Sequence, residues 1–140
     1  MTDINVGAIT EALNNKVDLP TPSTPQDAVD YVVEKQDPTS ANGYTWYRKY
    51  KSGWVEQGGF ASNIAWTGQG GGKTITLPIV MNDSNYTVSA TMGKNNTSWN
   101  CPGCRGFAES TTQISVSIAT LGNNQGTVEK VYWQVSGYAA

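Results

Sequence analysis

The stretch that most constrains the fold is Tyr44-Thr45-Trp46-Tyr47-Arg48-Lys49-Tyr50-Lys51-Ser52-Gly53-Trp54-Val55-Glu56-Gln57-Gly58-Gly59. Two runs rich in Tyr, Trp and Val flank Lys51-Ser52-Gly53, and this pattern predicts a β-hairpin with a glycine in its turn. Alternation places large aromatic side chains on both faces of the first strand. We therefore expect both faces to be covered, with a second copy of the chain as one candidate for the second cover.

This hairpin resembles a known family of proteins. Residues 46–50 and 53–59 are similar to the entry to the C-terminal domain of bacteriophage tail-fibre proteins. The resemblance continues through residues 75–80, 85–88 and 131–138, and it covers residues 44–140. It implies a small antiparallel β-sandwich similar in outline to the H-type lectins, which are trimers, and a role in attachment to a bacterial receptor.

Composition limits the classes of function. With 14% charged residues, 15 Gly, 5 Trp and 7 Tyr in 140 residues, the chain is typical of a β-rich extracellular protein of one compact domain plus an appendage. A net charge of −2 without a basic run argues against nucleic acid as a partner. No apolar stretch reaches the roughly 18–20 residues of a membrane span, so we expect no membrane insertion. No secretory signal is recognised at the N-terminus.

The first 43 residues form two predicted segments. Residues 1–19 carry Val6, Ile9 and Leu13 at helical spacing, which predicts a short helix that three chains would bury together; packing on its own domain is the alternative. Residues 20–43 begin with a Pro-rich connector. Residues 27–34 are ambiguous, since their start suits a helix and Tyr31-Val32-Val33 suits a strand. The family resemblance favours an extended strand at Tyr31–Gln36, and Asp37–Gly43 has the composition of a turn.

Residues 44–140 form the predicted tip domain. After the hairpin, alternating apolar residues predict further strands at residues 60–66, 73–81, 86–92, 112–120 and 127–136. The glycine run at residues 67–72 is predicted to be a flexible turn, and residues 93–106 a long polar loop. Six or seven strands at this spacing predict a mainly β fold, an antiparallel β-sandwich with a short N-terminal helix, which the resemblance extends to an intertwined homotrimer.

The sequence is poor in catalytic groups. It contains no His, which removes the commonest general base and the commonest metal ligand together. Seven of the eleven carboxylates precede residue 38, outside the predicted sandwich, and the others form no compact motif. We therefore expect no enzyme activity, no catalytic residues, no metal and no cofactor.

The motif Cys101-Pro102-Gly103-Cys104 has three interpretations. A redox pair belongs at a helix N-terminus, which is not predicted here. A zinc site needs four ligands, so it would have to pool residues across a trimer. The interpretation we favour is a tight turn whose cysteines are free or form a small local disulfide.

A binding site is the remaining candidate. The polar loop supplies amides, a cation and an indole, the groups that pair with sugar hydroxyls and cover the C–H face of a sugar ring. The predicted receptor-binding residues are Asn95, Asn96, Trp99, Asn100 and Arg105. Trp99 is either such a contact residue or a local core plug. The other tryptophans, Trp46, Trp54, Trp66 and Trp133, fall in predicted strands and are expected to be structural.

Together these patterns and the resemblance predict the tip of a phage tail fibre, located in the virion on the extracellular side of the host surface. The expected partners are two further copies of the chain, other tail proteins and a bacterial surface receptor, a glycan or a protein. The alternatives are a polysaccharide-degrading tail enzyme, which would need convergent carboxylates, and a purely structural fibre or assembly segment. Whether the chain is part of a longer fibre or a short fibre that joins an adaptor stays open.

Overall fold

A computed structural model describes residues 29–67, 70–93, 103–119 and 126–140 of the chain. The chain divides into two compact units, Met1–Tyr31 and Val32–Ala140. The predicted helix at residues 1–19 and the Pro-rich start of the connector lie outside the described residues. The second unit carries all the strands of the described ranges.

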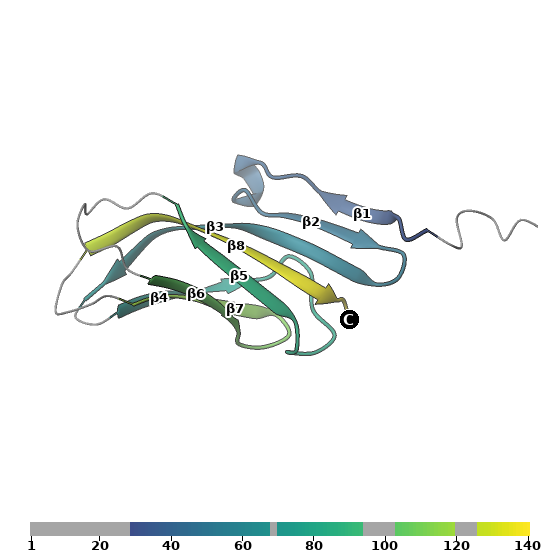
Figure 1. Cartoon of the computed structure of the whole chain (residues 1–140). Coiled ribbons are helices and arrows are strands. Elements are labelled where there is room, and N and C mark those ends of the chain that lie inside the picture. Colours follow the sequence, from purple (N-terminus) through teal and green to yellow (C-terminus); the bar gives the residue numbers. More distant parts are fainter. Residues whose placement is uncertain (1–28, 68–69, 94–102, 120–125) are drawn as a thin grey trace, which may run out of the picture. The chain divides into compact units, whose positions relative to one another are not determined.

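A five-stranded antiparallel sheet forms one layer of this unit, in the order β1-β2-β3-β8-β5 (Figure 1). Its strands are β1 (Val32–Gln36), β2 (Trp46–Tyr50), β3 (Trp54–Trp66), β5 (Thr87–Met92) and β8 (Gly126–Tyr138). A single 3-10 turn, η1 (Ser40–Asn42), joins β1 to β2 and ends at Gly43, whose φ of 66° is the left-handed conformation that glycine adopts without strain. The predicted strand before the turn and the aromatic hairpin of β2 and β3 are both confirmed.

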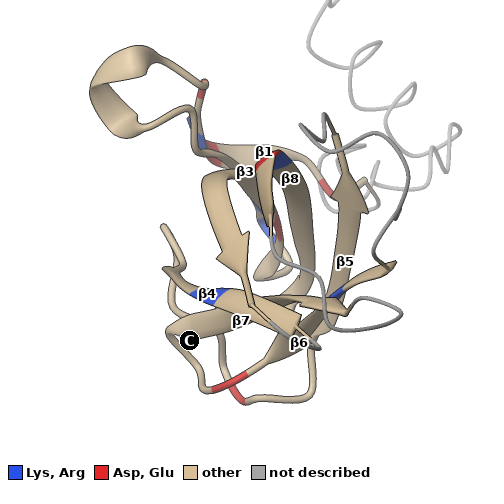
Figure 2. Ribbon diagram, turned by 90° about the vertical axis from the view of Figure 1, so that its left-hand side faces the viewer, with Lys and Arg blue, Asp and Glu red and all other residues tan. Residues whose placement is uncertain are grey.

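A three-stranded antiparallel sheet forms the other layer, in the order β4-β7-β6. Its strands are β4 (Gly70–Thr76), β6 (Gly103–Ala108) and β7 (Gln113–Ala119). Figure 2 shows this sheet facing β3, β8 and β5 of the larger one. The mainly β, antiparallel sandwich predicted from the sequence is therefore present, with eight strands in the described ranges instead of six or seven.

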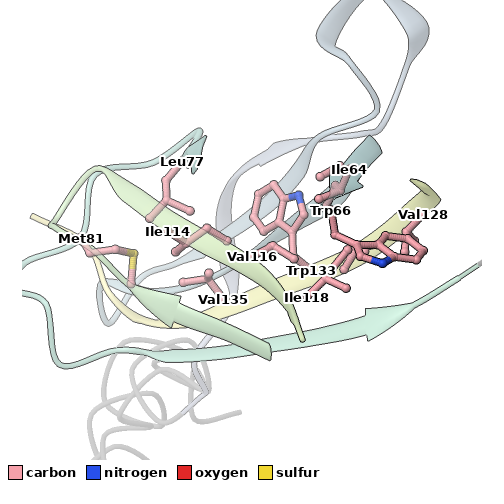
Figure 3. Packing of buried hydrophobic residues seen from close by; sticks show 12 residues of the cluster. Ile64, Trp66, Leu77, Met81, Ile114, Val116, Ile118, Val128, Trp133 and Val135 are labelled. Carbon is pink, nitrogen blue, oxygen red and sulfur yellow. The ribbon is translucent and has the colours of Figure 1, made fainter. Parts of the chain in front are cut away.

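The core lies between the two sheets and comes mainly from alternate residues of three strands (Figure 3). β7 contributes Ile114, Val116 and Ile118, which are at most 1% exposed. β3 and β8 add most of the other buried side chains, including the indoles of Trp66 and Trp133, which are 2% and 3% exposed. These two tryptophans are structural, as predicted. Burial of apolar side chains at about 25 cal/mol per Å² is the main force that holds the two sheets together.

The strand predicted at residues 60–66 is present, but it is not a separate strand, because β3 runs without interruption from Trp54 through the glycine pair. Successive residues of a strand point to opposite faces. A Cβ on Gly58 would lie 2.8 Å from the ring of Trp46, and one on Gly59 would lie 3.1 Å from the ring of Trp133. The two glycines therefore leave room for one indole on each face of the sheet, and they do not mark a turn.

The predicted flexible turn at residues 67–72 and the strand at residues 73–81 also need correction. Gly70, Gly71 and Gly72 are the start of β4 and pair with β7, and the strand ends at Thr76. Residues 77–81 follow as an irregular segment that buries Leu77 and Met81. A buried amide replaces the strand pairing there: Gln57 Nε2 donates to the Ile79 carbonyl oxygen at 2.9 Å, and Gln57 Oε1 accepts from Ile79 N at 2.9 Å.

The predicted loop at residues 93–106 is wrong at its C-terminal end, because residues from Gly103 onward form β6. β6 lies against β5 of the other sheet: a Cβ on Gly106 would lie 2.6 Å from Val88 Cγ1, and Cys104 Sγ lies 3.6 Å from the Ala90 carbonyl oxygen. The free thiol of Cys104 is thus half-buried between the sheets. Residues 94–102 of the predicted loop, including Cys101, lie outside the described residues.

Candidate functional site

The outward side of the larger sheet is the candidate site, and we call it the outer face. Register pairs Ser89 of β5 with Gln134 of β8, and Gln134 with Gly58 of β3. Because Val135 and Trp133 beside Gln134 are buried, these paired residues point away from the core. The side chains that define the outer face are Trp46, Trp54, Phe60, Ser89, Thr91, Tyr132, Gln134, Ser136 and Tyr138.

Aromatic rings are concentrated on one part of the outer face. Phe60 stacks on Tyr44 with ring centroids 5.5 Å apart and meets the edge of Tyr132 at 6.2 Å. The ammonium of Lys130 lies 4.8 Å from the centroid of Phe60, at cation–π distance. Tyr44 and Tyr132 remain 48% and 50% exposed. Tyr132 on β8 and Tyr44 in the turn before β2 therefore present exposed ring area to whatever binds there.

Beside these rings lies a shallow depression of about 240 Å³, the Trp46 hollow. Its lining is Trp46, Gly59, Ser89, Thr91, Tyr132, Trp133 and Gln134. Trp46 lies across Gly58, since a Cβ at that glycine would be 2.8 Å from its six-membered ring. An indole and a phenol therefore flank a floor that carries an amide and two hydroxyls.

A second depression of about 230 Å³, the Trp54 hollow, lies farther along β5 and β8. Its lining is Trp54, Asn82, Asp83, Asn85, Tyr86, Thr87, Ser136, Gly137 and Tyr138. Trp54 and Tyr138 meet edge to face at 5.2 Å. Asp83 Oδ1 accepts from Asn85 N at 2.7 Å, which fixes the turn that carries the amides.

A third feature is the tyrosine at the start of β5, which ties the turn of the Trp54 hollow to the smaller sheet. Tyr86 donates its hydroxyl hydrogen to the Ser110 carbonyl oxygen at 2.6 Å and lies 2.9 Å from that of Gln113. Burial, with Glu109 nearby, raises the pKa of Tyr86 above its ordinary value. Through these contacts the phenol attaches the turn of the Trp54 hollow to the segment between β6 and β7.

Charged groups of β1 and β2 are paired with one another. Arg48 Nη2 lies 2.7 Å from Asp37 Oδ1, and Lys35 Nζ lies 3.1 Å from Asp37 Oδ2. Hydrogen bonds from Lys35 and Arg48 lower the pKa of the Asp37 carboxyl. Tyr47 donates its hydroxyl to Glu34 at 2.7 Å, and this bond raises the pKa of Tyr47. Arg48 and Tyr47 of β2 thus contact Asp37 and Glu34 of the β1 segment, beside the backbone pairing of the two strands.

Both hollows combine flat aromatic rings with amide and hydroxyl groups. A flat ring covers the C–H face of a pyranose, while amides and hydroxyls pair with its hydroxyl groups. Both hollows are smaller than the roughly 300–1,000 Å³ clefts that enclose drug-sized ligands. Each therefore suits one ring-sized group of an otherwise exposed ligand.

The structure describes one of the five predicted receptor-binding residues. Arg105 is exposed on β6, with its guanidinium carbon 5.6 Å from the centroid of the Phe107 ring. It points away from β5, so it lies on the outward side of the smaller sheet and not on the outer face. Asn95, Asn96, Trp99 and Asn100 lie outside the described residues. The loop site therefore stays a prediction.

The residues of the outer face were missed at the level of sequence, because every strand tryptophan was expected to be structural. Trp46 and Trp54 are half-buried and line the two hollows. The signal was present in the last strand, where Tyr132, Gln134 and Ser136 alternate with the apolar Val131, Trp133 and Val135. An aromatic residue on the polar side of such a strand indicates a surface contact.

Comparisons with known proteins give one similar solved structure. It is a selenomethionine structure of an N-truncated R2-type pyocin tail fiber. The match covers 98% of this chain and 52% of that one, at 15% sequence identity and a TM-score of 0.47. The chain thus spans about half the length of that N-truncated chain. No family model and no curated protein matches the sequence.

Neither a metal centre nor a membrane-spanning helix is found in the part of the chain that the structure describes. Within the described residues, no group of three or more His, Cys, Asp or Glu side chains gathers in a way that could hold a metal ion. In the same ranges, none of the helices has both the length and the apolar character needed to cross a membrane.

Proposed function

We propose that this chain is the tip of a tail fibre and that its outer face attaches to a glycan of a bacterial surface. The observation that carries the proposal is the Trp46 hollow, where an indole and a half-exposed phenol flank an amide and two hydroxyls. The resemblance of the aromatic hairpin to tail-fibre tips supports the biological setting. In that setting the partners are other tail proteins and the bacterial receptor, and the place is the virion tail.

The binding proposal is tested on a panel of purified bacterial lipopolysaccharides and capsular polysaccharides, followed by titration of the one retained. Tyr132→Ala should weaken binding roughly tenfold, because it removes one aromatic wall of the hollow. Gln134→Ala should weaken it through lost hydrogen bonds to sugar hydroxyls. Thermal unfolding of each variant checks that the sandwich is intact.

Phe107→Ala is the matched control, since Phe107 is also an exposed aromatic residue, on the smaller sheet. It should leave binding unchanged. If Phe107→Ala or Arg105→Ala abolished binding while Tyr132→Ala did not, the site would lie on β6, next to the polar loop predicted from the sequence. If the folded parent bound no member of the panel, glycan attachment by this unit would be wrong.

The proposed fibre tip is a homotrimer, in which weak single sites act together. Support comes from the resemblance to trimeric tips and from the helical spacing of Val6, Ile9 and Leu13. Light scattering should give three times the 15.0 kDa mass of the chain. A monomer would contradict the trimer. A Tyr132→Ala variant of lower mass than the parent would identify the outer face as a contact between copies, and so would overturn the glycan site.

A polysaccharide-degrading enzyme remains the alternative from another class. A retaining or inverting glycosidase needs two carboxyl groups roughly 5–10 Å apart on either side of the scissile bond. Among the described residues, Asp83 is the one carboxylate that lines either hollow. We therefore place binding without cleavage first, and unchanged polymer length after prolonged incubation is the expected result.

A further inference from the structure

The two hollows lie next to one another on the same surface. Thr87 of β5 pairs with Ser136 of β8 in the Trp54 hollow, and Ser89 pairs with Gln134 in the Trp46 hollow. Ser136 and Gln134 are successive outward residues of one strand, so they are about 7 Å apart along it. The two hollows are therefore lined by neighbouring outward residues of β8, with no other outward residue of that strand between them.

Each hollow repeats the same chemistry. The Trp54 hollow combines Trp54 and Tyr138 with the amides of Asn82 and Asn85, as the Trp46 hollow combines Trp46 and Tyr132 with Gln134. Both are shallow and close to one volume, about 230 and 240 Å³. Neither is a deep pit that would enclose the end of a sugar chain. Two ring-sized depressions in line along a strand suit internal residues of an extended chain.

The charged residues in the lining indicate which charge the ligand can carry. Among the described residues that line the two hollows there is no Lys and no Arg, and Asp83 is an acid. Lys35 of β1 and Arg48 of β2 are paired with Asp37, and Lys130, the cation over the Phe60 ring, lines neither hollow. A carboxylate or phosphate on the sugar would meet no cation in the hollows and would be repelled by Asp83. An uncharged sugar meets neither penalty.

From this arrangement we infer that the Trp54 and Trp46 hollows are two subsites for one ligand, a linear stretch of uncharged polysaccharide lying along β5 and β8. This inference rests on the proposed glycan-binding function and adds the ligand class to it. A chain that fills both subsites gains the contacts of the second with little further loss of translational and rotational freedom. Affinity should therefore rise with chain length until both hollows are filled.

The test uses the full chain and neutral O-polysaccharide cut by mild acid into fragments of graded length, with an acidic capsular polysaccharide of uronic acids for comparison. The parent should bind the longest neutral fragment at least tenfold more tightly than the shortest, and the acidic polymer more weakly. Tyr138→Ala should remove most of the gain with length. Asn85→Ala, an exposed side chain at the turn, should reduce that gain without a change in thermal unfolding.

The outcomes separate this inference from the proposed function. Loss of binding in Tyr132→Ala together with full binding in Tyr138→Ala and Asn85→Ala would leave the glycan site at the Trp46 hollow and overturn the second subsite. An affinity independent of fragment length would overturn it as well. Tighter binding of the acidic polymer would overturn the uncharged ligand class. Full binding in both Tyr132→Ala and Tyr138→Ala would contradict the proposed function itself.

Discussion

Replacing Gln57 by leucine is expected to lower the free energy of unfolding by about 3 kcal/mol. Gln57 is fully buried, and its amide donates to and accepts from the backbone of Ile79 at 2.9 Å. Leucine keeps most of the volume but leaves the N–H and the C=O of Ile79 without these partners. A polar group that is shielded from water and left unpaired costs about 1–3 kcal/mol, and the two groups of Ile79 are half-buried. The segment that buries Leu77 and Met81 would lose its attachment to β3.

Urea unfolding of parent and variant at one protein concentration measures this difference. Gln113→Leu is the matched control, because Gln113 is an exposed glutamine on β7. It should change the free energy of unfolding by no more than about 0.5 kcal/mol. If Gln57→Leu were as stable as Gln113→Leu, the buried amide would not be what holds residues 77–81 in place.

Replacing Gly71 by alanine should cost about 2–3 kcal/mol, because extra volume in a packed site forces the backbone apart. A Cβ on Gly71 would clash with the Ala65 carbonyl oxygen and lie 2.9 Å from Trp66 Cα. Both are backbone atoms, so no side chain can turn away to make room. The variant must separate β4 from β3, at the point where the two sheets approach each other closely.

Gly103→Ala provides the control for this substitution, since a Cβ on Gly103 meets no atom within 4 Å. Both glycines lie in strands of the smaller sheet, so the loss of glycine flexibility in the unfolded chain is similar. The thermal midpoint of Gly103→Ala should match that of the parent or exceed it slightly. Equal destabilisation by the two substitutions would show that the close approach at Gly71 contributes little.

Strand identity could be read from the sequence wherever alternation was clean. The residues of β7 and β8 alternate apolar and polar side chains, and both strands were predicted within a few residues of their bounds. The glycines misled the prediction at β3 and β4. Their composition is that of a turn, whereas their place in the fold is set by neighbours distant in sequence: Trp46 and Trp133 at residues 58–59, and the backbone of Ala65 and Trp66 at Gly71.

The sequence predicted the types of side chain in the candidate site but not their position in the fold. Sugar-type side chains were expected in the polar loop, while the structure gathers such side chains on strands that pair only after folding. Ser89 and Gln134 are 45 positions apart and become neighbours through the β5–β8 register. The sequence around either residue does not indicate that the two residues pair in the sheet. A rule that separates buried from outward tryptophans would have found Trp46, since Gly58 faces it across the hairpin.

The central claim is that the outer face of the larger sheet is the ligand site, and a nuclear magnetic resonance titration tests it most directly. Isotope-labelled protein is titrated with the neutral polysaccharide fragment retained by the panel. The account predicts that the amide signals shifted by the fragment belong to β5 and β8 and centre on Ser89, Tyr132 and Gln134. Shifts confined to β6 around Arg105 and Phe107 would contradict it and place the site on the smaller sheet.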